Sequence, residues 1–326
     1  MNYIVLDLEW NQCPSGKEHS VDKLTFEIIE IGAYKLDSSL KLVDKFDELV
    51  KPQVYTKIHS IIGGIFKYTM EELNEKGDYF EFVIKRFLDW CGEDYIFCTW
   101  GPQDLTELQR NIRFYNLKYK FDYPLCYLDL QKLFSIKYED GKTRRSLEYA
   151  VEYLNIDKDI PFHHAIDDVC YTTEILKKMK LEGLEKYYSI DLYRKPASKK
   201  EEIHIVYDTY YKYISRAFGS KEKAMLDREV KSARCYLCDR EESVRNMTKI
   251  ANWFSDSSKT YYFLGECEQH GFIKGKIRMK KTEDDRVYVV KTLKATDMDG
   301  ASQVLEKQLA IREKRRRKRL GLGEEG

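Results

Sequence analysis

The segment YIVLDLEW, residues 3–10, decides the fold of this chain. It is a short apolar run in which polar residues enter only near the end, a pattern typical of a buried strand whose carboxyl end carries function. Because side chains on a strand alternate between its two faces, Asp7 and Glu9 project from the same face. The segment therefore predicts a strand with two carboxylates at its tip, which can share one metal ion.

The next segments predict a mixed α/β domain. FEIIEIGAYKL (26–36) and LVDKFDELVKP (42–52) have the β-branched residues and partial alternation of strands, so an antiparallel meander is expected. A capping box at Thr69 and Glu72 opens an expected helix over 69–92. YIFCTWG (95–101) is the fourth expected strand, CYLDLQKLFS covers 126–135, and further helices are expected over 104–116, 144–155 and 167–188. This order implies an α/β fold in which helices flank a mixed sheet.

Composition and charge indicate a folded chain with two electrically opposite halves. The 326 residues are 43% hydrophobic and 34% charged, with no apolar run near the roughly 20 residues of a membrane span and no signal peptide at the start. We expect a cytoplasmic protein without membrane contact. Residues 1–182 hold 24 basic and 32 acidic residues, a net charge of −8, whereas the remainder holds 32 and 23, a net charge of +9. A polyanion-binding module joined to a carboxylate-rich site is one interpretation, and unevenly solvated surfaces are the other.

The C-terminal half predicts helices followed by a small β-rich module. EEIHIVYDTYYKYISRAF (201–218) and KEKAMLDREVKSA (221–233) are each interpreted as an amphipathic helix. Short alternating runs follow, and a basic helix ends the chain. The expected domains are a catalytic domain over 1–182, a helical connector over 183–232, a metal-binding module over 233–295 and a basic helix and tail over 296–326.

Two further acids are expected to join Asp7 and Glu9. Asp104 follows a strand and begins a helix, and Asp168 lies in the first turn of a later helix. Strand ends and helix starts converge at one edge of such a sheet, so the four carboxylates should meet there. Like charges this close repel unless cations neutralise them, and oxygen ligands favour two Mg²⁺ or Mn²⁺ ions. Two such ions would activate a water and stabilise the departing 3′ oxygen of a phosphodiester.

His163, five residues before Asp168, is placed to take the proton of the attacking water. Its neighbour His164 and the second aspartate, Asp167, are near-duplicates. Spacing favours the pair His163 and Asp168, which leaves His164 as a backbone-contacting neighbour and Asp167 as a surface or helix-capping carboxylate.

These motifs resemble the DEDDh exonucleases, a family named for four acidic residues and a histidine. Asp7-Leu8-Glu9 is similar to the first motif, WGPQD (100–104) to the second and HHAIDD (163–168) to the third. FEIIEIG (26–32) and IHSIIG (58–63) are similar to family segments between the first two motifs, so the resemblance covers about residues 1–180. It is greatest to the subgroup that trims structured RNA 3′ ends. The resemblance implies an RNase H-like fold and a hydrolase that releases nucleoside 5′-monophosphates from 3′ ends.

Three residues are expected to contact the substrate: Trp10, which could stack on the terminal base, and Ile62 and Trp100 within the segments of resemblance. A core position beneath the site is the other interpretation of Trp10. Trp10 and Asn11 stand where many family members carry a small residue and a threonine or cysteine beside the terminal sugar. Single-stranded or frayed RNA is favoured over DNA as the substrate, and a DNA exonuclease, an inactive nucleic-acid-binding adaptor and an internally cutting RNase H-like enzyme are the alternatives.

A second metal site is expected in the C-terminal half. Cys235-x-x-Cys238 and Cys267-x-x-His270, separated by 28 residues, have the spacing of a structural zinc site with three thiolates and one imidazole. Coincidental core cysteines are the alternative. Basic residues surround it at Lys274, Lys276, Arg278, Lys280 and Lys281. Residues 312–319 contain seven basic residues in eight, which could contact the ribosome or a structured RNA, or be only a solvated face.

Overall fold

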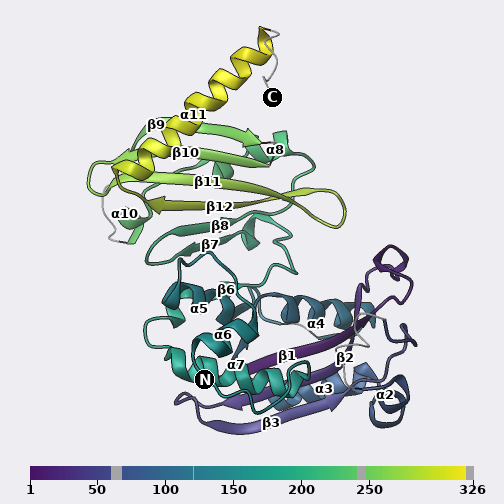
Figure 1. Ribbon diagram of the computed structural model, residues 1–326. Coiled ribbons are helices and arrows are strands. Elements are labelled where there is room, and N and C mark those ends of the chain that lie inside the picture. Colours follow the sequence, from purple (N-terminus) through teal and green to yellow (C-terminus); the bar gives the residue numbers. More distant parts are fainter. Residues whose placement is uncertain (60–67, 120, 241–246, 258, 321–326) are drawn as a thin grey trace. The chain divides into compact units, whose positions relative to one another are not determined.

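The structure is a computed structural model that describes residues 1–59, 68–119, 121–240, 247–257 and 259–320. The chain divides into two compact units, Met1–Tyr193 and Arg194–Gly326, and each contains a six-stranded sheet (Figure 1). No helix among the described residues has the length and apolar character needed to cross a membrane.

The first unit is built on a mixed sheet with the strand order β3-β2-β1-β4-β5-β6. Its strands are β1 (Asn2–Gln12), β2 (Phe26–Leu36), β3 (Leu42–Leu49), β4 (Tyr95–Thr99), β5 (Cys126–Asp129) and β6 (Ser189–Ile190). β1, β2 and β3 form the predicted antiparallel meander, whereas β1, β4 and β5 run parallel. The segment YIVLDLEW is thus the strand where the antiparallel and parallel parts of the sheet join.

Helices cover both faces of this sheet. They are α2 (Met70–Lys76), α3 (Phe80–Cys91), α4 (Gln103–Phe114), α5 (Leu130–Tyr138), α6 (Leu147–Tyr153) and α7 (Ala165–Met179), with short 3-10 turns at Lys17–His19 and Glu185–Tyr187. Ile4, Leu6 and Leu8 of β1 pack with α3 and α4, while Val5 packs with α5, α6 and α7. The alternation of β1 therefore turns Asp7 to the α7 face. The predicted α/β fold with a mixed sheet between helices is confirmed.

The helix predicted over 69–92 is two helices, so that prediction was wrong in its continuity. The capping box at Thr69 and Glu72 is present, but α2 ends at Gly77 and the chain becomes extended. Asp78 then pairs with the end of β3, accepting from the Lys51 N–H at 2.8 Å and donating to the Leu49 carbonyl at 3.1 Å. A Cβ on Gly77 would lie 2.8 Å from the Lys51 nitrogen, so only glycine permits this approach.

Two other boundaries differ from the sequence-based expectation. Residues 126–135 contain the short strand β5 and the start of α5, with Asp129 capping the helix by accepting from the Lys132 N–H. The helix predicted over 167–188 ends at Met179, because Lys180 takes a positive φ of 50° and stops it.

The second unit contains an antiparallel sheet with the strand order β7-β8-β12-β11-β10-β9. Its strands are β7 (Ile203–Val206), β8 (Tyr211–Ile214), β9 (Met247–Ser257), β10 (Thr260–Cys267), β11 (Gly271–Lys281) and β12 (Val287–Ala295). Its helices are α8 (Lys221–Leu226), α9 (Arg228–Lys231), α10 (Tyr236–Arg240) and α11 (Met298–Arg319), with a 3-10 turn at Lys199–Glu201. The expected β-rich module and basic final helix are both present.

The helix predicted over 201–218 was wrong, because this segment forms the hairpin β7 and β8. Tyr211 and Tyr213 alternate with Lys212, so the two rings enter the core of the unit, as the period of a strand requires. β8 pairs with β12 along its whole length. Residues 203–214 of the connector are therefore part of the second sheet, whereas Ser189–Ile190 belong to the first. Its α-helices are α8 and α9, within the segment 221–233 and separated at Asp227.

Candidate active site and metal centre

The pairing of β1 with β2 places the first two carboxylates. Asp7 lies opposite Gly32 and Glu9 lies opposite Glu30, and a register shift follows Glu9. Directly paired residues in an antiparallel ladder share a face, so these side chains lie on the face that α7 covers. An oxygen of Asp7, one of Glu9 and one of Asp168 all lie within 4.8 Å of one another.

Gly32 is the reason that Asp168 reaches this cluster. A Cβ on Gly32 would lie 2.4 Å from the carbonyl carbon of Ala165 and 2.5 Å from the nitrogen of Ile166. The first turn of α7 thus rests on the bare backbone of β2 beside Asp7. Asp168 donates its own N–H to the His164 carbonyl at 2.9 Å, in the first hydrogen bond of α7, so its side chain belongs to that same turn.

Asp104 approaches from the other edge of β1 and is not within 4.8 Å of all three of these acids. β4 pairs with β1 only as far as Val5 and Cys98, so the backbone beyond Val5 is open on this edge. Gly101, with a φ of 100°, turns the chain from β4 into α4, and Asp104 lies in the first turn of that helix. The backbone N–H of Leu8, between the first two acids, hydrogen-bonds Asp104 and so favours its ionised form.

Burial and mutual repulsion disfavour the ionised form of these acids. Burial raises the pKa of Asp7 well above its ordinary value, and the charges of Asp104, Asp168 and Glu9 raise it further. Burial, with the charges of Asp168 and Asp104, raises the pKa of Glu9 to about 8. The pKa of Asp104 is raised by burial to about 7, although the Leu8 N–H opposes the shift. Such a set fits divalent cations, since cations supply the positive charge that would let all of its members ionise.

His163 occupies a strained turn ahead of α7. Its φ is 71°, a left-handed conformation that costs a residue with a side chain about 1 kcal/mol or more. Both neighbours are anchored: Phe162 stacks on Tyr171 with ring centroids 4.6 Å apart, and the His164 ring lies 4.9 Å from that of Tyr68. The imidazole of His163 itself is exposed. The turn therefore holds this side chain out toward solvent, five residues before Asp168.

A sequence model of an exonuclease family, RNase_T, matches residues 4–176, which contain all five of these residues. The chain belongs to this exonuclease family. The matched span lies within the first unit, which is therefore an exonuclease domain.

Relatives with names and solved structures match the same kind of domain. The chain is 26% identical over 168 residues to the 3′-5′ exoribonuclease 1 of Rattus norvegicus, and the match covers 49% of this chain and 48% of the rat protein. The chain thus spans about half the length of that relative. It is also 26% identical over 178 residues to the "Probable 3'-5' exonuclease KapD" of Bacillus subtilis, covering 53% of this chain and 82% of KapD. Among solved structures, the nuclease domain of 3′hExo, a DEDDh family member bound to rAMP, has a TM-score of 0.49 at 21% identity over 59% of this chain and 96% of that domain.

A second acidic group in the exonuclease domain was not expected from the sequence. Glu30 is fully buried, and its Oε1 lies 3.6 Å from Nδ1 of His164. Burial raises its pKa to about 8, the Ala165 N–H opposes the rise, and the charges of Asp47, Glu9 and Asp167 add to it. His164 and Asp167 thus lie beside Glu30, at the base of the turn that carries His163. Glu30 lies opposite Glu9 in the ladder of β1 and β2. A prediction of the register between these two strands would therefore have identified Glu30.

The residues after Glu9 are held by packing and by a loop. The Trp10 ring is partly buried, with its centroid 5.5 Å from that of Phe26. Asn11 is fully buried and donates to the carbonyls of Tyr55 and Lys57, each at 2.9 Å. Asn11 therefore holds the 55–59 loop in place. This structural role was not expected from the sequence, in which Asn11 was considered only as a neighbour of the terminal sugar.

The other expected substrate contacts differ in what the structure shows. Trp100 donates its indole N–H to the Arg145 carbonyl at 3.0 Å and packs against Phe134. A contact between its remaining edge and a substrate stays a prediction. Ile62 lies outside the residues that the structure describes.

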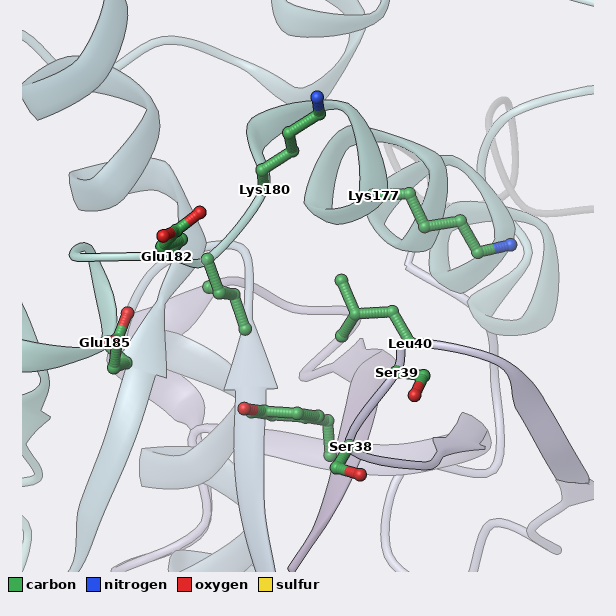
Figure 2. Close-up of a pocket in the computed structure, with 9 residues that line it drawn as sticks. Ser38, Ser39, Leu40, Lys177, Lys180, Glu182 and Glu185 are labelled. Carbon is green, nitrogen blue, oxygen red and sulfur yellow. The ribbon is translucent and has the colours of Figure 1, made fainter.

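A hollow of about 600 Å³ lies at the other end of β1 (Figure 2). Tyr3, the Ser38–Leu40 turn, and the end of α7 with Lys177 and Lys180 line it. It contains none of the candidate active-site residues. The hollow therefore lies apart from the carboxylate cluster, which is the candidate active site.

The four expected zinc ligands meet in the second unit. Cys235 precedes α10, Cys238 lies within it, and Cys267 and His270 flank the turn between β10 and β11. The Sγ atoms of Cys238 and Cys267 are 3.4 Å apart, and Nδ1 of His270 lies 3.3 Å from Cys238 Sγ and 3.5 Å from Cys235 Sγ. Gly271 closes the turn with a φ of 67°. A zinc ion bonded to nitrogen at about 2.0 Å and to sulfur at about 2.3 Å, in tetrahedral geometry, would hold its donor atoms at separations near these. The four side chains therefore fit a tetrahedral zinc ion.

Proposed function

We propose that this protein is a metal-dependent 3′-to-5′ exonuclease that removes nucleoside 5′-monophosphates from single-stranded or frayed RNA. The observation that carries the proposal is the meeting of Asp7, Glu9 and Asp168 within 4.8 Å, with Asp104 as a charged neighbour, in a chain of the exonuclease family. The names of the rat and Bacillus relatives support the direction of cleavage.

The four carboxylates would hold two Mg²⁺ or Mn²⁺ ions, which when bound would supply an activated water and charge stabilisation for the departing oxygen. His163 is the proposed general base, because its strained turn holds an exposed imidazole ahead of the helix that carries Asp168. Asp104 is fixed by the Leu8 N–H and Asp168 by the seat of α7 on Gly32. The protein thus builds the site on rigid elements before any substrate arrives.

RNA is the proposed substrate because the rat relative is named an exoribonuclease. Trp10, with its partly buried ring at the end of β1, is the proposed stacking partner of the terminal base. The Cys235, Cys238, Cys267 and His270 set is proposed to hold one structural Zn²⁺, because all four positions are filled by the protein and none is open to a reacting group.

The direct test is incubation of the whole chain with Mg²⁺ or Mn²⁺ and RNA and DNA oligonucleotides of one sequence, labelled at the 5′ end. We expect a ladder that shortens from the 3′ end, faster on RNA. A ladder of equal rate on DNA would reassign the sugar preference. Internal cuts, or no cuts with either metal, would contradict the proposed activity.

A further inference from the structure

Strand β11 of the second unit presents apolar side chains on one side of the sheet and basic side chains on the other. Ile273, Ile277 and Met279 are buried in the core with α8, α9 and the cysteine cluster. The intervening side chains project from the other face. That face, which we call the basic face, is the side of β11, β12 and β8 that carries Lys212, Lys274, Lys276, Arg278, Lys280 and Lys294.

Strand pairing places these cations in rows that run across neighbouring strands. Lys276 of β11 pairs with Thr292 of β12, which in turn pairs with Lys212 of β8. Lys274 pairs directly with Lys294 in the same way. Along β11 the cations recur every second residue, about 6.6 Å apart at the rise of a strand. The sequence alone did not predict that Lys212 and Lys294 lie on this face. Lys212 was placed in a helix over 201–218, and Lys294 reaches the face only through the pairing of β11 with β12.

The cations of the basic face repel one another without local compensation. Among the residues that the structure describes, no carboxylate lies within ion-pair distance of Lys212, Lys276, Arg278 or Lys280. Burial lowers the pKa of Lys212, and the charge of Lys280 lowers it further. By contrast Lys281, which follows Lys280 and so points to the opposite side of β11, forms an ion pair with Asp285 at 2.7 Å. Like charges gathered on one face are unfavourable alone and are relieved by a polyanion.

On this side of the sheet, helix α11 lies over β9, β10 and the Phe272 end of β11, where its Gly300 lies beside Lys274. Its Ala301 and Val304 pack on Ala251 of β9 and Leu264 of β10. At that border Tyr262 lies between two cations, with Lys307 Nζ 4.4 Å and Lys276 Nζ 5.4 Å from its ring centre. Figure 1 shows α11 crossing over β9 and β10 and extending beyond the sheet.

We propose that the basic face binds the phosphate backbone of single-stranded nucleic acid and is the main polymer-holding surface of the second unit. The inference rests on the proposed function, for which it supplies the grip on the chain whose 3′ end is cut. A flat sheet with cations repeated along a strand matches an extended, repeating polyanion. The zinc cluster lies in the core of the opposite face, so its part is to hold the sheet together and not to contact the polymer.

The test compares two variants of the full chain that lose the same charge. K276Q/R278Q/K280Q removes three cations from β11, and K221Q/K223Q/K231Q removes three from α8 and α9, which pack on the opposite face. Binding of a fluorescent single-stranded RNA is measured by anisotropy in Ca²⁺, over a series of salt concentrations. Circular dichroism melting of both variants establishes that each is folded.

The β11 variant should bind at least about tenfold more weakly, and its plot of log affinity against log salt should be shallower by about 2. The α8 and α9 variant should remain within about twofold of the wild type. Equal losses in both variants, or no measurable binding by the wild type, would overturn the inference.

Cleavage of a trinucleotide in Mn²⁺, measured in parallel, reports the proposed function separately. Cleavage without any effect of the β11 substitutions on RNA binding would refute the basic face alone. Binding that depends on β11 without cleavage would refute the exonuclease activity alone.

Discussion

Asp7 of β1 lies directly opposite Gly32 of β2, and the missing side chain at Gly32 is what allows α7 to rest beside Asp7. The ladder sets the position of one carboxylate, and the glycine beside it admits the helix that carries another. A site made from residues far apart in the chain is thus assembled by one pair of facing positions in a sheet.

Gly32→Ala should damage both stability and catalysis. Its Cβ would meet the backbone of Ala165 and Ile166 at about 2.5 Å or less, and backbone cannot rotate away as a side chain can. We expect a loss of roughly 1 to 3 kcal/mol in the free energy of unfolding, the usual cost of overpacking, and a fall in the rate of nucleotide release. Thermal melting and single-turnover kinetics measure the two effects.

Gly219→Ala is the matched control, because its new Cβ would meet only the side chain of Lys223 at 3.8 Å. That variant should keep the wild-type rate. If Gly32→Ala also kept it, the close seat of α7 would have no part in building the site.

The stability of the metal-free protein should fall as pH rises from about 5 to 8. In the folded state the pKa of Glu9 is about 8 and that of Asp104 about 7, against ordinary values of 4.5 and 3.8. Between these limits the folded protein binds protons that the unfolded chain has released, so raising the pH favours unfolding. Mg²⁺ replaces those protons, and the rise in Tm that it causes should therefore be larger at pH 8 than at pH 5.5.

Asp7→Asn provides the comparison for this pH series, since it removes the acid on which the charges of Asp104, Asp168 and Glu9 converge. The variant should show a flatter dependence of Tm on pH and a smaller response to Mg²⁺. A Mg²⁺ effect that is the same at both pH values in the wild type would argue against cation binding at the cluster.

The two adjacent histidines should differ in the kind of defect they produce. His163→Ala should slow cleavage by about 100-fold or more with little change in Tm, because its side chain is exposed and acts only on the reaction. His164→Ala removes a ring that contacts Tyr68 and faces buried Glu30, so it should lower the Tm. An unchanged rate in His163→Ala would transfer the role of base to another group.

Loss of the zinc site should destabilise the second unit. Cys238→Ser removes a fully buried ligand, and we expect a Tm lower by more than about 10 °C for the transition of that unit, together with loss of the metal. Cys126→Ser, at a half-buried cysteine outside the cluster, is the control and should retain about one zinc per chain by elemental analysis. The opposing result would come from wild-type protein purified without zinc. If adding zinc did not change its Tm, a structural role for the metal would be contradicted.

The sequence was sufficient to predict those elements whose structure follows from a local pattern of residues. The apolar run before Asp7 gave the central strand, the alternation of 26–36 and 42–52 gave the meander, and two short cysteine and histidine pairs gave a cluster whose atoms do meet. Each of these depends on periodicity or on spacing within a few residues.

Features that depend on pairing between distant segments were missed. The break at Gly77 arises because Asp78 pairs with the end of β3, and the hairpin at 203–214 exists because β12 accepts β8 as a neighbour. Glu30 gains its significance only from its register with Glu9 and from the arrival of α7. No window of the sequence contains such relationships, since tertiary pairing overrides local propensity.

The release of the 3′-terminal nucleotide by Asp168→Asn, measured in Mn²⁺ beside the wild type, tests the carboxylate site most directly. Binding of the same RNA is measured in Ca²⁺, so that a loss of affinity is separated from a loss of chemistry. We predict that the variant binds RNA within a few fold of the wild type and releases nucleotide at least about 1,000-fold more slowly, as expected when a group that stabilises the transition state is lost. Turnover by Asp168→Asn at a rate near that of the wild type would contradict the assignment of the cluster as the catalytic centre.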